Sequence, residues 1–120
     1  MFNVISRTQL SDFSSYVNTN HNDNERGYRN KQIEDVLGGY GKGICSFIVD
    51  TNHPNGYEIH TITDNGVIVI QNERTKRIVT TLIARENQIR RYFVNGVMPI
   101  EIYAILSVAD NHHKKGYNNW

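Results

Sequence analysis

Residues 43–92 read GICSFIVDTNHPNGYEIHTITDNGVIVIQNERTKRIVTTLIARENQIRRY, and this stretch decides the fold. Clusters of turn-forming and charged residues break it into short apolar runs that are rich in β-branched side chains. Such runs between turns are typical of strands, and the dipeptide Asn-Gly is a strong hairpin signal. We therefore expect an antiparallel meander of four strands, at residues 44–49, 57–63, 67–71 and 78–84.

Helical spacing of apolar residues precedes the predicted meander. Residues 8–17 place their apolar side chains on one helical stripe behind a candidate N-cap, Thr8. Residues 31–37 repeat this spacing and end at a Gly-Gly pair, while the intervening segment is rich in Asn and is typical of an exposed loop. We expect a helical part over residues 8–38 that packs on one face of the sheet.

A further helical pattern follows the predicted meander. Pro99 suits the first turn of a helix, and apolar residues recur behind it at helical spacing. The last residues, 112–120, are polar and are expected to fray. The sequence therefore predicts one α+β domain over residues 1–120, in which N-terminal helices are followed by a four-stranded antiparallel β-meander (43–92) and an additional C-terminal helix (99–111).

The turns also predict a register for the strands. A two-residue turn at Asn65-Gly66 places His60 opposite Gln71, and a four-residue loop at 73–76 places Val69 opposite Thr80. Because side chains alternate along a strand, this register gives the sheet two unlike faces. The more polar face is expected to carry His60, Gln71 and Thr80, and to form a cleft.

Charge and cysteine content narrow the classes of function. The formal net charge is +1, so no overall field favours nucleic acid or a membrane surface, although residues 74–91 hold six Lys or Arg and one acid. The single cysteine, Cys45, excludes an internal disulfide and a zinc site made of thiolates. No apolar run approaches the roughly 18 residues that span a bilayer. We expect a cytoplasmic protein with no membrane partner.

His60 is the residue best suited to acid–base chemistry, because histidine titrates near neutral pH. RNA needs little else for cleavage, since its 2′-hydroxyl is an internal nucleophile; a base, an acid and groups that stabilise phosphate charge suffice. Thr80 and Arg85 suit the last role, Glu58 can orient or replace the histidine, and His53 is a second histidine. The alternative interpretation is structural, because strand histidines are often half-buried and threonines pack well in sheets.

Residues 55–93, NGYEIHTITDNGVIVIQNERTKRIVTTLIARENQIRRYF, resemble a pattern found in small phage and polymorphic-toxin proteins of Gram-positive bacteria. Helices followed by an antiparallel meander also resemble the barnase/EndoU/colicin/RelE group of metal-independent ribonucleases. The active face of the sheet in that group carries histidine, threonine or serine, arginine or lysine, and tyrosine. The resemblance implies four catalytic residues in this chain: His60, Thr80, Arg85 and Tyr92.

Five further residues are expected to bind the substrate: Lys42, His53, Glu58, Arg90 and Arg91. Lys42 belongs to the glycine-rich connection that precedes the first predicted strand. The two arginines belong to the basic and aromatic run after the last one. The resemblance implies Arg91 as a phosphate contact, and it implies neither a metal nor a cofactor.

The leading hypothesis is a metal-independent endoribonuclease of toxin type, which cuts RNA by 2′-hydroxyl attack in the cytosol of a host or target cell. Such a toxin is expected to have an immunity or antitoxin protein as its partner. The alternative from another class is a phage-encoded anti-defence protein that binds a nucleotide or a host protein without catalysis. A structural or interaction domain is a third hypothesis, and a homodimer formed through the C-terminal helix stays open.

Overall fold

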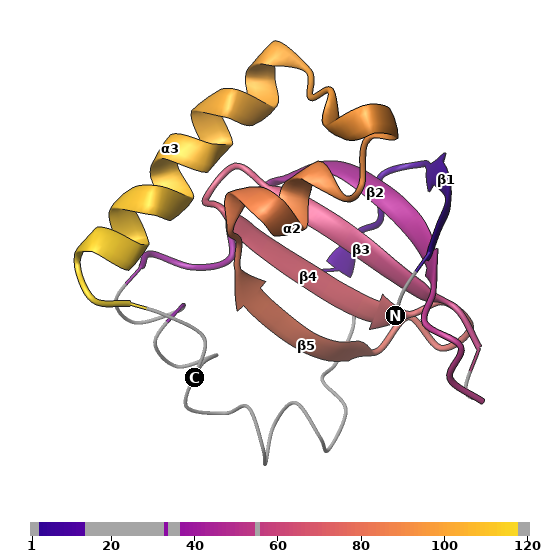
Figure 1. Cartoon of the computed structure of the whole chain (residues 1–120). Helices are drawn as coiled ribbons and strands as arrows, with labels where there is room; N and C mark the ends of the chain where they lie inside the picture. Colours follow the sequence, from indigo (N-terminus) through magenta and orange to yellow (C-terminus); the bar gives the residue numbers. More distant parts are fainter. Residues whose placement is uncertain (1–2, 14–32, 34–36, 55, 118–120) are drawn as a thin grey trace.

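The computed structural model describes residues 3–13, 33, 37–54 and 56–117 of the chain, and its centre is a five-stranded antiparallel sheet (Figure 1). Neighbours in the sheet are neighbours in the chain. The strands are β1 (Asn3–Thr8), β2 (Gly43–Asp50), β3 (Glu58–Thr63), β4 (Val67–Asn72) and β5 (Ile78–Ile83). After them come the short helix α2 (Glu86–Arg90), the 3-10 turn η3 (Val94–Gly96) and the main helix α3 (Ile100–Lys114).

The order of elements corrects the predicted fold class. A strand, and not a helix, opens the described chain, and the sheet has five strands where the sequence predicts four. Thr8, expected to cap a helix, instead ends β1 and pairs with Ser46 of β2. Residues 14–17 of that predicted helix, and most of the second one at 31–37, lie outside the described residues, although Ile33 is helical and buried.

β1 does not show the sequence pattern of a strand with one buried face. A bulge between Val4 and Ser6 breaks the alternation, and most of its side chains are exposed. An edge strand of this kind supplies no apolar run that a pattern could detect. The other four strands are confirmed to within one residue at each end, because their turn signals are local.

The register differs from the predicted one at the β3–β4 hairpin. His60 pairs with Ile70, which leaves a three-residue loop, 64–66, in place of the predicted two-residue turn. Gly66, with φ of +72°, supplies the left-handed conformation that such a loop needs. The predicted pairing of His60 with Gln71 is therefore wrong.

A β-bulge at the next hairpin shifts the register again. Asn72 N–H donates to Arg77 O (3.0 Å), which confirms the predicted pairing at the loop. Beyond the bulge, however, Ile70 pairs with Thr80. The two shifts cancel for this threonine, so it does share a face with His60.

Gln71 lies on the opposite face from His60, because the hairpin shift moves it across the sheet. It is fully buried there, and its amide oxygen accepts a hydrogen bond from Ser11 Oγ (2.7 Å) while its amide nitrogen donates to Lys76 O (2.8 Å). These partners satisfy an amide whose burial would otherwise be costly. The predicted pairing of Val69 with Thr80 is also wrong, and the predicted polar face is not formed.

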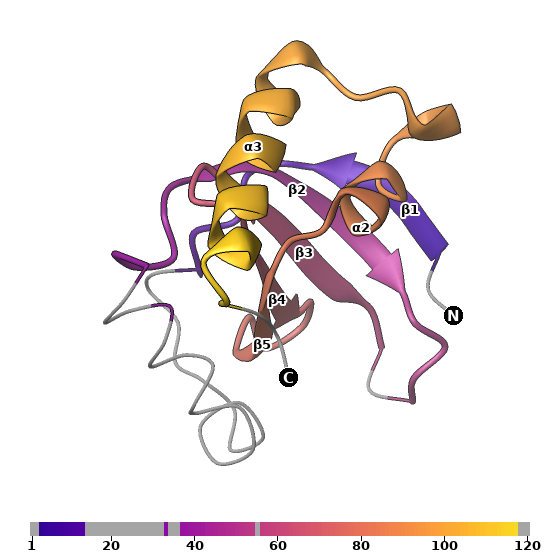
Figure 2. The same cartoon turned by 60° about the vertical axis from the view of Figure 1, so that its left-hand side comes forward.

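Two apolar clusters fill the two faces of the sheet. α2 and α3 lie on the same side of it (Figure 1, Figure 2), and their packing against the strands forms the larger cluster. The buried members of this cluster are Cys45, Phe47, Val49, Ile62, Ile68, Ile70, Ala84, Ile89, Tyr92, Met98, Ile102, Ile105 and Ala109. Those described in the cluster on the other face are Phe13, Ile33, Val67, Val69, Ile78 and Ile83. His60 therefore lies on the helix-covered face.

α3 confirms the predicted helix and extends beyond it. Pro99 is its N-cap residue, and Ile102 and Ala109 are buried as the spacing predicts. His112, expected in a frayed tail, is helical, and its Nε2–H donates to Asn65 O (3.1 Å) in the β3–β4 loop. The prediction of a frayed tail is therefore wrong for the first residues of 112–120, because α3 continues to Lys114.

Candidate functional site

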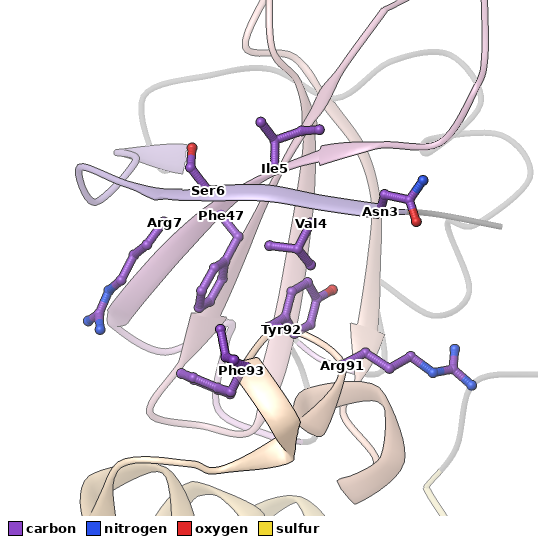
Figure 3. Close-up of a pocket in the computed structure, with 10 residues that line it drawn as sticks. Asn3, Val4, Ile5, Ser6, Arg7, Phe47, Arg91, Tyr92 and Phe93 are labelled. Carbon is purple, nitrogen blue, oxygen red and sulfur yellow. The ribbon is translucent and has the colours of Figure 1, made fainter.

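A groove runs along the edge strand β1, between it and the chain that follows α2 (Figure 3). Its volume is about 610 Å³, within the range of small-molecule sites. β1 with its neighbour Phe47 forms one wall, and residues 91–94 form the other. The lining residues are Asn3, Val4, Ile5, Ser6, Arg7, Phe47, Arg91, Tyr92, Phe93 and Val94.

Three aromatic rings form part of the two walls, Phe47 in one and Tyr92 and Phe93 in the other. The Phe47 ring stacks on Tyr92, with centroids 5.1 Å apart, and meets Phe93 edge-on at 5.4 Å. The end of α2 fixes the backbone that carries two of these rings. Tyr92 N–H donates to Ile89 O (3.1 Å), and Phe93 N–H donates to Arg90 O (3.2 Å). Phe47 and Tyr92 are buried, whereas Phe93 is half-buried. Phe93 therefore keeps surface for a ligand.

An arginine stands at each end of the aromatic row (Figure 3). Arg7 pairs with Phe47 across β1 and β2 and so lies on the same face, while Arg91 ends α2 as its C-cap residue. Both arginines are exposed, and none of the lining residues is acidic. The groove therefore favours an anionic ligand.

A chain of two hydrogen bonds, one buried and one partly buried, supports the Tyr92 ring. Its Oη lies 2.5 Å from His60 Nδ1, and His60 Nε2 lies 2.9 Å from Glu58 Oε1. Because a carboxylate can only accept, Nε2–H donates to Glu58, and in the neutral ring Nδ1 accepts from the phenol. Burial raises the pKa of Tyr92, and the charge of Glu58 raises it further, against the effect of Arg91. The phenol therefore stays protonated and keeps donating.

His60 is the central residue of a hydrogen-bonded triad, with Tyr92 on one side and Glu58 on the other. The residue is 4% exposed, and both ring nitrogens are hydrogen-bonded. A fully satisfied polar network inside a protein rigidifies its surroundings. The triad therefore fixes the position of the Tyr92 ring in the wall of the groove.

The structure brings together only some of the predicted catalytic residues. His60 and Tyr92 are hydrogen-bonded, with Glu58 beyond them. Thr80 shares their face of the sheet but lies two strands away from His60. Arg85 lies at the opposite end of α2 from the groove, where it lines a separate pocket against α3.

Of the predicted substrate-binding residues, only Arg91 lines the groove, and Glu58 is connected to it through His60 and Tyr92. Arg90 forms an ion pair with Glu86 (3.3 Å) and donates from Nη1 to Gly96 O (3.0 Å), so it stabilises the turn after α2. Lys42 and His53 are exposed in the connections on either side of β2. Neither residue lines the groove.

Arg7, Phe47 and Phe93 are groove residues that the sequence did not indicate as functional. Phe47 belongs to an apolar run and is a core residue as well as a wall of the groove. Phe93 belongs to the basic and aromatic run after the last predicted strand, next to Tyr92, which is a predicted catalytic residue. No sequence pattern marks Arg7 as functional, because its position at the groove depends on β1, a strand that the sequence does not predict.

Comparisons with known proteins return no relative. No protein-family model, no curated protein and no solved structure matches the chain. Within the described ranges, no group of three or more His, Cys, Asp or Glu side chains could hold a metal ion. The same part of the chain contains no helix that is long and apolar enough to cross a membrane.

Replacing Tyr92 by Phe is expected to lower the free energy of unfolding by about 1–3 kcal/mol, because His60 Nδ1 loses its phenol donor in a buried position. Urea unfolding at neutral pH measures this change. Tyr103→Phe is the matched control, since that side chain is 48% exposed, and it should change little. Equal stabilities of Tyr92→Phe and the wild type would contradict a stabilising triad.

The same variant has an expected signature at alkaline pH. The pKa of Tyr92 is higher in the folded than in the unfolded protein, so its contribution is complete below the unfolded value of about 10 and is lost as the pH rises toward the folded value. The stability of the wild type should therefore fall more steeply above that pH than the stability of Tyr92→Phe. Parallel curves would contradict a raised pKa.

Proposed function

We propose that the protein binds nucleotides in the groove, either as free nucleoside phosphates or as part of a single-stranded RNA. The observation that carries this proposal is the aromatic row with an arginine at each end. Single-stranded nucleic acids are bound by stacking of bases on aromatic rings and by cationic contacts to phosphates. Here Phe93 offers a stacking surface, and Arg7 and Arg91 offer the cations. A cytosolic location, where nucleotides and RNA are abundant, is part of the proposal.

Binding without catalysis is favoured by the surroundings of His60. A general base must come within hydrogen-bond reach of the proton that it takes from a substrate. Both nitrogens of His60 already have partners, and the side chain is almost fully buried. Thr80 and Arg85 do not line the groove. The nucleotide-binding alternative therefore fits this geometry better than RNA cleavage.

Phe93→Ala is expected to weaken binding of a short, fluorescently labelled oligoribonucleotide about tenfold or more, because stacking of a base on an aromatic ring is worth about 1–3 kcal/mol. Fluorescence anisotropy in low salt measures the affinity, and nucleoside phosphates as competitors distinguish a free nucleotide from RNA. Tyr57→Ala is the control, since Tyr57 is an exposed aromatic residue outside the groove. Unchanged affinity of Phe93→Ala would contradict the proposed stacking.

A second candidate function is metal-independent cleavage of RNA, as the ribonuclease resemblance predicts. The triad favours it, because Glu58 and His60 are arranged as an orienting acid and a base toward a phenol in the groove wall. Incubation with total RNA in EDTA tests this function. If cleavage occurs, His60→Ala should slow it about 100-fold or more. RNA that is bound but stays intact would leave binding as the function and remove the need for an immunity partner.

A further inference from the structure

A second pocket lies where the chain passes from β5 into α2, beside α3 (Figure 1). Its volume is about 690 Å³, within the range of small-molecule sites, and it shares no lining residue with the groove. Residues 84–87 form one wall, and one face of α3 forms the other. The lining residues are Ala84, Arg85, Glu86, Asn87, Tyr103, Leu106, Ser107, Asp110 and His113.

Opposite charges stand on the two walls of this pocket. Arg85 and Asp110 both line it without forming an ion pair with each other, and no acidic side chain in the described part of the chain pairs with Arg85. Asp110 is held only weakly, because its carboxylate lies 4.0 Å from Lys114 Nζ and the two side chains are 71% and 74% exposed. The pocket therefore offers a cation and an anion to a ligand that carries both charges.

His113 adds a hydrogen-bond acceptor to the wall that carries Asp110. A carbonyl oxygen can only accept, so His113 Nε2–H donates to Ala84 O (3.2 Å), and Nδ1 of the neutral ring is an acceptor. Nδ1 is buried and has no hydrogen-bond partner among the described residues. Buried polar atoms are almost always paired, so this nitrogen favours a ligand that brings a donor. A small turn of the ring would direct Nδ1 to a donor in the pocket.

A ligand with only one kind of charge suits this pocket less well. An anion such as phosphate would meet the carboxylates of Glu86 and Asp110, and an amine without a carboxylate would leave Arg85 without a partner. The groove differs in this respect, because its walls carry arginines and no acidic residue. The two sites are therefore expected to select different ligands.

We propose that this pocket binds a free α-amino acid with an aromatic side chain, as the zwitterion. The planar guanidinium of Arg85 can form two parallel hydrogen bonds with the carboxylate of the ligand. The ammonium of the ligand donates to the carboxylate of Asp110 and to Nδ1 of His113. Tyr103, which is 48% exposed, and Leu106 offer ring and aliphatic surface to the aromatic side chain. The inference does not depend on the ligand proposed for the groove.

L-Phenylalanine and two analogues test the proposal in amide chemical-shift titrations of ¹⁵N-labelled protein. Phenethylamine lacks the carboxylate, and phenylpropionate lacks the ammonium. L-Phenylalanine should shift the amides of residues 84–87 and 103–113, and each analogue should bind about tenfold more weakly, because it loses one charge-assisted contact. The absence of such shifts up to about 20 mM phenylalanine, or equal affinity for either analogue, would overturn the proposal.

Two variants that each remove one charge test the assigned partners. Arg85→Gln should weaken binding of L-phenylalanine about tenfold and leave binding of phenethylamine unchanged, whereas Asp110→Asn should weaken both and leave phenylpropionate unchanged. Both side chains are exposed, so both variants should fold. Lys115→Gln is the control, since Lys115 is an exposed cation at the end of α3 that does not line the pocket. If Arg85→Gln and Lys115→Gln bind L-phenylalanine equally well, Arg85 does not hold the carboxylate and the proposal is wrong.

Discussion

Reversing the charge of both groove arginines, in an Arg7→Glu/Arg91→Glu variant, is expected to lower the affinity for single-stranded RNA by at least about 100-fold at low salt. Each hydrogen bond to a charged group contributes about 1.5–3 kcal/mol, and the reversal adds repulsion to its loss. Two lost phosphate contacts should also reduce the slope of log affinity against log salt by about 1.4. Anisotropy titrations at several salt concentrations measure both quantities.

The matched control for this variant is Lys114→Glu/Lys115→Glu. It makes the same change in net charge, but its residues lie at the C-terminal end of α3 and do not line the groove. Its affinity for RNA in about 0.1 M salt should stay within a few-fold of the wild type, because at that ionic strength exposed charges beyond the Debye length of about 10 Å are largely screened. If both double variants lose the same amount of affinity for RNA, binding depends on net charge and the groove is not the binding site.

Replacing Gly66 by Val is expected to lower the free energy of unfolding by about 3 kcal/mol or more. Gly66 has a φ of +72°, which a β-branched residue adopts only with strain. A Cβ atom there would also lie 2.9 Å from the backbone of Ala109, so the β3–β4 loop and α3 would have to separate. Thermal or urea unfolding measures the loss.

Gly116→Val separates the backbone strain at positive φ from the steric clash with Ala109. Gly116 also has a positive φ, of +94°, but a Cβ atom there meets nothing within 4 Å. This variant should therefore show only the backbone cost, of about 1–2 kcal/mol or less at a helix end. If Gly66→Val is no more destabilising than Gly116→Val, close packing of α3 on the hairpin loop is not important for stability.

The parts of the fold that depend on local sequence could be predicted. Strands β2 to β5 and helix α3 have apolar periodicity and turn residues inside their own segments, and the structure confirms them. The register could not be predicted in the same way, because it depends on whether Gly66 belongs to a two-residue or a three-residue loop. A one-residue difference moves Gln71 to the opposite face of the sheet.

The groove depends on contacts between distant segments and was largely beyond sequence reasoning. β1 pairs with β2 across a long stretch of chain, and its bulge hides the alternation of a strand. Arg7 and Phe47 therefore meet residues 91–94 at a place that no local pattern marks. His60 and Tyr92, both predicted to be catalytic, are hydrogen-bonded to each other. Arg85 lies away from them because of the direction of α2, and the sequence does not predict this helix.

The most direct test of nucleotide binding in the groove is a titration of ¹⁵N-labelled protein with a short single-stranded oligoribonucleotide, followed by amide chemical shifts in EDTA. Binding as proposed should shift the amides of β1, of Phe47 and of residues 91–94, and Arg7→Glu/Arg91→Glu should abolish these shifts. The absence of shifts up to millimolar RNA would contradict the proposal. So would shifts confined to the separate pocket that is lined by Arg85, Tyr103 and His113.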